Sequence, residues 1–89
     1  MARYLLIISN RADKFLKKLN EKRLLRVIQE INDLENFPFF TAPHDLAKLK
    51  GRKEYYRTRV GDLRIIFKVN KEQRKIYIEK VGYRKKIYK

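Results

Sequence analysis

Apolar residues in the first half of the chain recur in two different patterns. Tyr4 to Ser9 is a short, nearly continuous apolar run, which predicts a fully buried strand. Ser9 and Asn10 both suit a helix N-cap, and the residues that follow have the three- and four-residue spacing of an amphipathic helix. That stripe consists of Ala12, Phe15, Leu16 and Leu19. Asn20 is the expected helix stop.

A second stripe with the same spacing predicts a second helix. Its members are Leu24, Val27, Ile28, Ile31 and Leu34. Because the connection between the stripes is short, we expect an antiparallel helical hairpin. From Asn36 to Pro43 the periodicity stops, since Pro38 and Pro43 are incompatible with a regular helix. Phe37, Phe39 and Phe40 give this irregular segment its own apolar anchor.

After Gly51 the period changes to two, which is typical of strands. Three strands are predicted, Glu54–Val60, Leu63–Val69 and Lys75–Val81, joined by hairpin turns at Gly61-Asp62 and at residues 70–73. The element order is β-α-α-β-β-β. We therefore expect an α+β fold, with the helical hairpin packed on one face of a mainly antiparallel four-stranded sheet. Residues 1–89 are expected to form a single domain.

Alternation along the strands assigns the arginines to one face of the sheet. Arg57 and Arg59 point away from the face that carries Thr58. In the next strand Arg64 alternates with apolar residues that should pack on the helices. These are Leu63, Ile65, Phe67 and Val69. Arg57, Arg59 and Arg64 are thus predicted to lie together on the face that the helices leave open.

The charge of the chain indicates what this face would bind. The chain has 24 Lys and Arg against 10 Asp and Glu, a net charge of +14, which favours a polyanionic partner, an acidic protein partner, or both. A merely solvated basic surface is the plain alternative. Arginine suits phosphate because its planar fork binds two oxygens at once. With nearby aromatic residues, such a cluster suits single-stranded RNA.

Several kinds of site are excluded by composition. Without cysteine there is no disulfide, thiolate nucleophile or sulfur-based zinc site. With His44 as the one histidine, a histidine cage within one chain is excluded too, and nothing at useful spacing orients His44 for catalysis. The apolar run near the amino end is too short for a signal peptide or a membrane span. A soluble, cytoplasmic protein is expected.

Three motifs in the second half occur in the order of a known superfamily. They are Leu49-Lys50-Gly51, then Tyr56-Arg57-Thr58-Arg59-Val60-Gly61-Asp62-Leu63-Arg64-Ile65-Ile66-Phe67, and finally Val81-Gly82-Tyr83-Arg84 with Ile87-Tyr88. This set resembles the RelE/ParE toxin superfamily, whose members carry a Leu-x-Gly, a YRxRxGxYR hairpin and a terminal HRxxxY. The resemblance covers essentially the whole chain, because the preceding strand and helical hairpin have the order and lengths of the family.

The resemblance implies a toxin of a type II toxin–antitoxin system and, for RelE-type members, a ribonuclease. Such members cut messenger RNA in the ribosomal A site by attack of the 2′-hydroxyl on the adjacent phosphate, with no metal ion or other cofactor. Their basic hairpin residues and a C-terminal arginine hold the phosphate, and a C-terminal tyrosine orients or stacks on the substrate. The matching residues here are Arg57, Arg59, Arg64, Arg84 and Tyr88. The implied partners are a ribosome, mRNA and an acidic RelB-like antitoxin.

Two departures from the family pattern concern proton transfer. Tyr83 stands where many members have histidine, and Arg57 and Arg59 stand where some have lysine. Because arginine effectively never loses its proton, the general base is left unassigned among Tyr88, Glu79, Lys80 and a group of the ribosome. Two further functions remain open, a ParE-like poison of DNA gyrase and a non-catalytic RNA-binding module.

Overall fold

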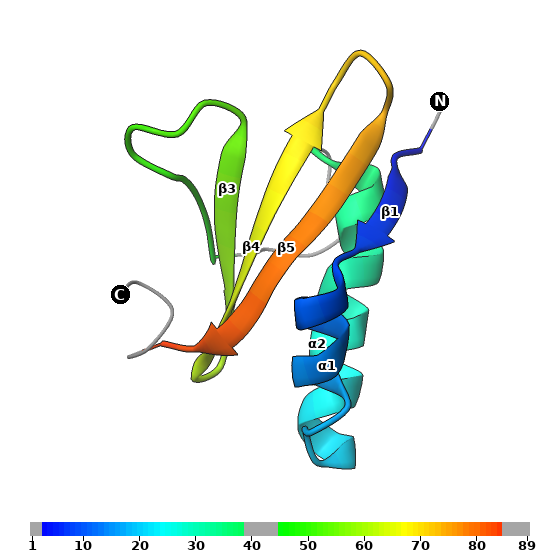
Figure 1. Ribbon diagram of the computed structural model, residues 1–89, viewed down its shortest axis with the longest axis vertical. Helices are drawn as coiled ribbons and strands as arrows, with labels where there is room; N and C mark the ends of the chain where they lie inside the picture. Colours follow the sequence, from blue (N-terminus) through cyan, green and yellow to red (C-terminus); the bar gives the residue numbers. More distant parts are fainter. Residues whose placement is uncertain (1–2, 39–44, 85–89) are drawn as a thin grey trace.

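The computed structural model describes residues 3–38 and 45–84. These residues fold into two α-helices and one sheet (Figure 1). In chain order the elements are β1 (Leu5–Ile8), α1 (Asn10–Leu16), α2 (Glu21–Asp33), a 3₁₀ turn (Leu34–Asn36), β2 (Asp45–Lys48), β3 (Tyr55–Val60), β4 (Leu63–Asn70) and β5 (Lys75–Tyr83).

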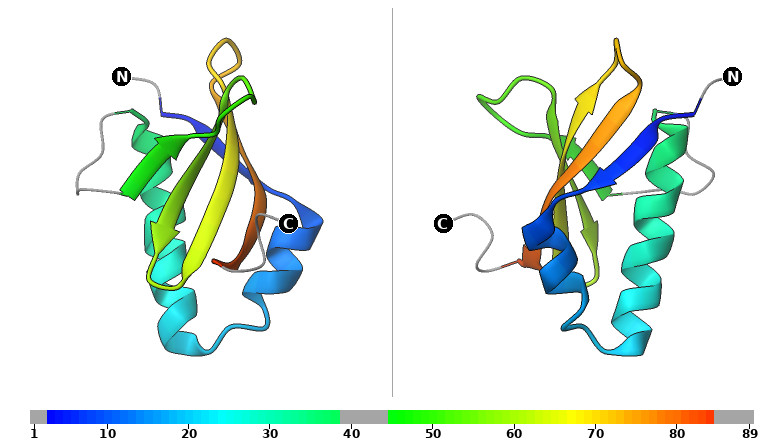
Figure 2. Two further views of the ribbon diagram at one scale, coloured as in Figure 1. Left: turned by 90° about the vertical axis from the view of Figure 1, so that its left-hand side faces the viewer. Right: turned by 45° about the vertical axis from the view of Figure 1, so that its right-hand side comes forward.

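The strands form one mixed sheet in the order β1-β5-β4-β3-β2. β1 pairs with β5 in parallel, and the other three pairings are antiparallel. Both helices lie on the same side of the sheet, run in opposite directions and diverge from their short connection (Figure 2). The predicted α+β fold, with helices on one face of a mainly antiparallel sheet, is confirmed.

The predicted number of strands is wrong, because the sheet has five strands and not four. The additional strand is β2, which pairs antiparallel with β3 from Asp45 opposite Arg59 to Lys48 opposite Tyr56. Its four residues are too few for alternation to be recognised, and charged residues stand at both ends. It is a strand because β3 offers an edge with which it can form hydrogen bonds.

The prediction of a fully buried first strand is also wrong. β1 is an edge strand, in which Leu5 is 60% exposed and Ile8 is 38% exposed. A short apolar run is compatible with either position, since periodicity does not report how many neighbours a strand has. Tyr4, immediately before β1, is buried.

Side-chain caps fix the starts of both helices. The Ser9 hydroxyl accepts a hydrogen bond from the Ala12 amide (3.1 Å) and donates one to the Glu79 carbonyl (2.8 Å), so it joins α1 to β5. α1 ends at Leu16, earlier than expected, so Asn20 is not a helix stop. It is the N-cap of α2, where its side chain accepts from the Arg23 amide at 2.9 Å. No helix in residues 3–38 or 45–84 is long and apolar enough to cross a membrane.

The hydrophobic core lies between the helices and the sheet. Val27 and Ile31 of α2 are buried against it, as the second stripe predicts. Its aromatic centre is the Phe37 ring, whose centroid lies 5.2 Å from Tyr56 and 6.3 Å from Phe67. Phe37 is therefore an apolar anchor as expected. Phe39 and Phe40 lie outside the described residues.

An irregularity in β5 decides which residues of its second half face the core. Lys80 is opposite Ile66 and Ile78 is opposite Phe67, so Glu79 is an extra residue on the β5 side. Ile78 and Val81 are three residues apart and would point to opposite faces of a regular strand, yet both are buried in the core. The bulge thus places Lys80 and Gly82 on the open face and keeps Val81 in the core.

Thr58 links β3 to α2 through a polar contact. Its side chain is fully buried, and its hydroxyl donates to the Glu30 carboxylate at 2.6 Å. Replacing Thr58 with valine keeps the shape and removes this charged hydrogen bond, so the free energy of unfolding should fall by about 1.5–3 kcal/mol. Urea denaturation measures the change, and an unaltered midpoint would contradict it. Thr58→Ser, which keeps the hydroxyl, is the control.

Candidate functional site

Three arginines share the sheet face that the helices leave uncovered. Thr58 points to α2, so its neighbours Arg57 and Arg59 point the other way. Arg59 stands directly opposite Arg64 of β4, and directly opposite residues of paired strands point to the same side. The structure therefore places Arg57, Arg59 and Arg64 together, as the alternation predicts.

Arg64 is the most enclosed residue of the set. It is only 5% exposed, although it lies on the open face. The residue paired with it on β5 is Gly82, which has no side chain to place beside the guanidinium. Burying a guanidinium is costly unless it is compensated, and placing it directly opposite Arg59 adds repulsion between like charges. Two guanidinium groups side by side on one sheet face can together bind an anion such as a phosphate.

Asp45 of β2 supplies negative charge to this group. Arg57 Nη1 donates to the Asp45 carboxylate at 3.1 Å and to the Asp45 carbonyl at 2.7 Å. Arg59 Nη1 donates to the other carboxylate oxygen at 3.3 Å. Sequence reasoning missed Asp45, because only the pairing of β2 with β3 brings it opposite Arg59.

The two arginines change the acidity of Asp45. The hydrogen bond from Arg57, aided by the charges of Arg59 and Arg57, lowers the pKa of Asp45 below its usual 3.8. Because the folded-state pKa is depressed, this contact stabilises the fold fully above the unfolded-state pKa. Its contribution is lost as the pH falls through the lower folded-state value. At neutral pH the carboxylate is charged.

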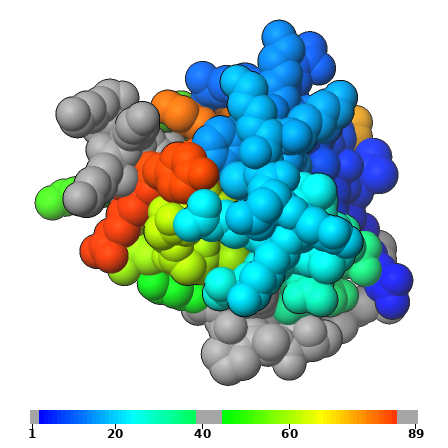
Figure 3. All heavy atoms as spheres, turned by 90° about the horizontal axis from the view of Figure 1, so that it is seen from below, coloured from blue at the N-terminus to red at the C-terminus, as the bar shows by residue number. Residues whose placement is uncertain are grey.

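Arg84 lies beside the β3–β4 turn at the end of the same sheet. Its amide donates to the Asp62 carbonyl at 2.9 Å, which continues the β4–β5 pairing by one residue. The Asp62 carboxylate in turn accepts from Arg23 of α2 at 2.9 Å. Figure 3 shows this turn (yellow-green), the end of β5 (red) and α2 (cyan) gathered at one end of the molecule. Arg84 is exposed there.

Of the remaining sequence-based candidates, two are described. The Glu79 carbonyl accepts from Ser9 and Arg11, and Glu79 is the extra residue of the β5 bulge. Lys80 lies on the open face opposite Ile66. Tyr88 and His44 lie outside the described residues. Within residues 3–38 and 45–84 no three Asp, Glu or His side chains are grouped as metal ligands would be.

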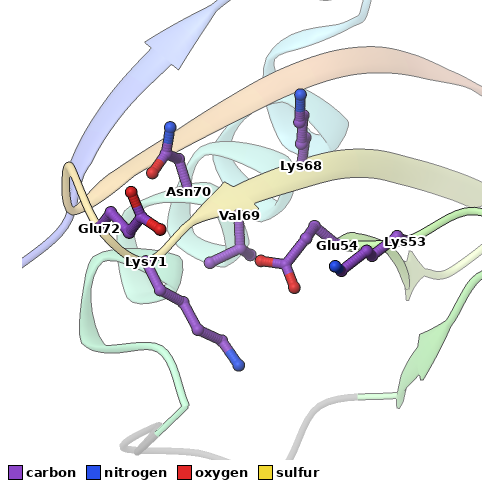
Figure 4. Close-up of a pocket in the computed structure, with 7 residues that line it drawn as sticks. All are labelled: Lys53, Glu54, Lys68, Val69, Asn70, Lys71 and Glu72. Carbon is purple, nitrogen blue, oxygen red and sulfur yellow. The ribbon is translucent and has the colours of Figure 1, made fainter.

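A cleft lies at the opposite end of β4 from Arg64. It has a volume of about 450 Å³ and is formed where the loop before β3 meets the β4–β5 turn (Figure 4). Glu54 in this loop has a left-handed backbone with φ +68°. The lining residues are Lys53, Glu54, Lys68, Val69, Asn70, Lys71 and Glu72. None of the arginines of the open face lines this cleft.

Comparison with known proteins gives a family. Residues 6–88 match the family model described as the ParE toxin of type II toxin–antitoxin systems, parDE. A curated protein of Methanocaldococcus jannaschii named "Putative toxin RelE1" is 34% identical over 82 residues, which is 92% of this chain and 91% of that protein.

Solved structures of toxin–antitoxin complexes have the same fold. The toxin in the RelE–RelB complex of Pyrococcus horikoshii superimposes with a TM-score of 0.81 at 30% identity, over 94% of this chain and 98% of that one. The RelB–RelE complex of Methanococcus jannaschii gives 0.75 at 30% identity, over 92% and 94% of the two chains. The family match over residues 6–88 and these relatives show that the chain belongs to the RelE/ParE superfamily of type II toxin–antitoxin toxins, with relatives of the RelE type.

Proposed function

We propose that this toxin is a ribosome-dependent endoribonuclease that cuts mRNA in the A site and so inhibits translation in the cytoplasm. The observation that carries the proposal is the group of three arginines on the open face of the sheet. Arg59 of β3 and Arg64 of β4 are directly opposite each other, and Arg57 lies two residues before Arg59 in β3. Three guanidinium groups on one face can surround a single phosphate and bind it through paired hydrogen bonds.

The proposed reaction is an internal transesterification of the RNA. The 2′-oxygen loses its proton and forms a bond to the adjacent phosphorus, and the bond to the 5′-oxygen breaks. That oxygen takes up a proton and leaves, which yields a 2′,3′-cyclic phosphate. Negative charge accumulates on the phosphorane oxygens in between, and preorganised donors that stabilise such charge typically accelerate a reaction strongly. Arg57, Arg59 and Arg64 are the proposed donors, and no metal ion is required.

Arg84 and Tyr88 complete the proposed site. Arg84 follows β5 and lies beside the β3–β4 turn, at the end of the sheet where β4 begins with Leu63 and Arg64. We assign it a further phosphate contact, and Tyr88 the role of orienting or stacking on the substrate. Tyr88, Glu79, Lys80 and a group of the ribosome remain the possible bases. Positioning of the mRNA by the ribosome would itself lower the barrier.

The test is primer extension on a translated mRNA after induction of the toxin. A nuclease that acts in the A site produces cuts phased with the codons, and these cuts should disappear when translation initiation is blocked. Cuts without codon phase, or cuts that persist on naked mRNA at the same rate, would contradict the ribosome dependence. Purified toxin added to programmed ribosomes gives the same readout without other cellular nucleases.

A second candidate function is poisoning of DNA gyrase. It is favoured by the description of the matching family model, which is that of ParE toxins. Such a toxin acts by binding a protein and does not need a group of arginines on an open sheet face. DNA breaks that depend on gyrase, with no cut mRNA, would establish this alternative. If the toxin causes neither mRNA cuts nor gyrase-dependent DNA breaks, the remaining candidate is a non-catalytic RNA-binding module.

We also propose an acidic RelB-like antitoxin as the partner that keeps the chain inactive. The similar archaeal toxins were solved as complexes with RelB, and a net charge of +14 attracts an acidic protein and speeds its association. On so small a domain the partner should be extended and fold as it binds.

Toxins of this family are expected to have their antitoxin encoded beside them, so co-expression with the neighbouring gene tests the antitoxin proposal. We expect the two proteins to co-purify in a complex that does not cleave mRNA, and cleavage to return when the antitoxin is removed by denaturation and refolding of the toxin. If the toxin emerges alone, or if the complex cleaves at the rate of the free toxin, the proposed partner is wrong.

A further inference from the structure

The Asp45 carboxylate contacts two cations, whereas two other surface carboxylates of the described residues, Asp13 and Asp62, form one ion pair each. Asp13 pairs with Lys17 at 3.0 Å and Asp62 pairs with Arg23 at 2.9 Å, one cation each. The Asp45 carboxylate contacts two arginines with its two oxygens, Arg57 at 3.1 Å and Arg59 at 3.3 Å. Both of these belong to the proposed phosphate site.

The position of Asp45 is fixed by the sheet. It is the first residue of β2 and stands directly opposite Arg59, which itself stands opposite Arg64. Asp45, Arg59 and Arg64 therefore form one row across three strands. Without the carboxylate this row would hold two neighbouring positive charges with no anion between the strands, and repulsion would drive the Arg59 side chain toward solvent.

The contact with Asp45 leaves one edge of the Arg59 guanidinium without a protein acceptor at Nε, within the part of the chain that the structure describes. Asp45 accepts from Nη1 of both arginines. Among the described residues nothing accepts a hydrogen bond from Arg59 Nε, although that atom is buried. Because the carboxylate accepts from Nη1 only, it does not use the edge formed by Nε and Nη2, whose two parallel donors match two oxygens of a phosphate.

We propose that Asp45 is a positioning residue, which holds Arg57 and Arg59 by Nη1 and so aims their remaining donors at the scissile phosphate. This inference rests on the proposed ribonuclease function. Asp45 does not itself contact the RNA in this scheme. Its effect on the two arginines is unequal, because Arg57 Nη1 also donates to the Asp45 main-chain carbonyl at 2.7 Å, a bond that survives any substitution of the side chain. Arg59 depends on the carboxylate.

The substitution Asp45→Asn tests the proposal, with Asp13→Asn as a matched control. Both remove one negative charge from a half-exposed carboxylate, 53% exposed at Asp45 and 50% at Asp13, and Asp13 lies on α1, on the helical side of the sheet. The first measurement is the heteronuclear NOE of the arginine Nε–H groups by NMR, assigned with Arg57→Lys and Arg59→Lys. We expect the Arg59 signal to lose order in Asp45→Asn and the Arg57 signal to lose less.

The second measurement separates turnover from binding. For Asp45→Asn the single-turnover cleavage rate on saturating programmed ribosomes should fall about tenfold or more, because the Arg59 donors are no longer held in position toward the scissile phosphate. Affinity for a single-stranded RNA with 2′-O-methyl groups, which cannot be cut, should not weaken, since a negative charge has been removed. A purely structural role would instead lower rate and affinity together. Asp13→Asn should leave the cleavage rate unchanged.

Three results would overturn the positioning role of Asp45. They are an unchanged Arg59 NOE in Asp45→Asn, a wild-type cleavage rate in that variant, and a parallel loss of cleavage rate and RNA affinity. If the wild-type toxin and Asp13→Asn cut no mRNA at all, the proposed function is wrong. The NMR measurement then still shows whether Asp45 orders Arg59.

Discussion

Replacing Arg64 with alanine is expected to slow mRNA cleavage about a hundred- to a thousandfold and to abolish growth arrest. Arg64 is the most buried arginine of the open face, 5% exposed, and lies between Arg59 and Gly82 in one row of the sheet. A donor enclosed in this way contributes more to stabilising a developing charge than one that water surrounds. Arg84→Ala should act in the same direction.

Two further variants keep this prediction interpretable. Arg64→Lys retains the charge but loses the planar fork, so its rate should lie between those of Arg64→Ala and the wild type. Arg3→Ala removes the same charge from a side chain that is 73% exposed and pairs with Glu35, and it should cleave normally. Circular dichroism establishes that each variant is folded. A folded Arg64→Ala that cuts ribosome-bound mRNA at the wild-type rate would exclude Arg64 from the site, and a wild-type rate for Arg64→Lys alone would show that the charge suffices without the planar fork.

Replacing Phe67 with alanine is expected to lower the free energy of unfolding by about 3–5 kcal/mol. Phe67 is fully buried in the middle of β4, where its ring stacks on Tyr56 at 5.7 Å and meets the edge of Phe37 at 6.3 Å. The whole stability of a small domain is only about 5–15 kcal/mol. This one substitution should therefore leave a large share of the molecules unfolded near 37 °C.

Thermal unfolding followed by circular dichroism measures the effect, and the midpoint should fall by about 12 °C or more. Phe15→Ala is the comparison, because Phe15 is only partly buried and its ring meets Tyr83 edge-on at 5.5 Å. It should shift the midpoint much less. If both substitutions lower the midpoint equally, the buried aromatic residues around Phe37 do not contribute more to stability than the partly buried Phe15 does.

Sequence patterns predicted the fold where the periodic segments are long. The α2 stripe and the alternation of β3 and β4 span several repeats, so their apolar faces were identified and Arg57, Arg59 and Arg64 were placed together. Two features depend on pairing between strands and escaped prediction. β2 is four residues long and exists through its hydrogen bonds to β3, so the contact of Asp45 with two arginines could not be foreseen.

The position of the β5 bulge corresponds to a change in the spacing of apolar residues along the sequence. Ile76 and Ile78 are two residues apart, whereas the next core residue, Val81, follows after three. A change in spacing from two to three within one strand indicates an inserted residue, here Glu79. The exposure of β1 had no such signal, because an apolar edge strand and a central strand have the same pattern.

The order of the strands has a consequence for synthesis of the toxin. β5, the last strand of the described residues, is an interior strand, and it pairs with the first, β1. The hydrogen bond between Ser9 and Glu79 spans 70 positions of the chain. Contacts this distant form slowly and only after both partners have been made. The nascent chain can therefore complete neither its sheet nor the arginine group that β5 borders until β5 has left the ribosome that is translating it.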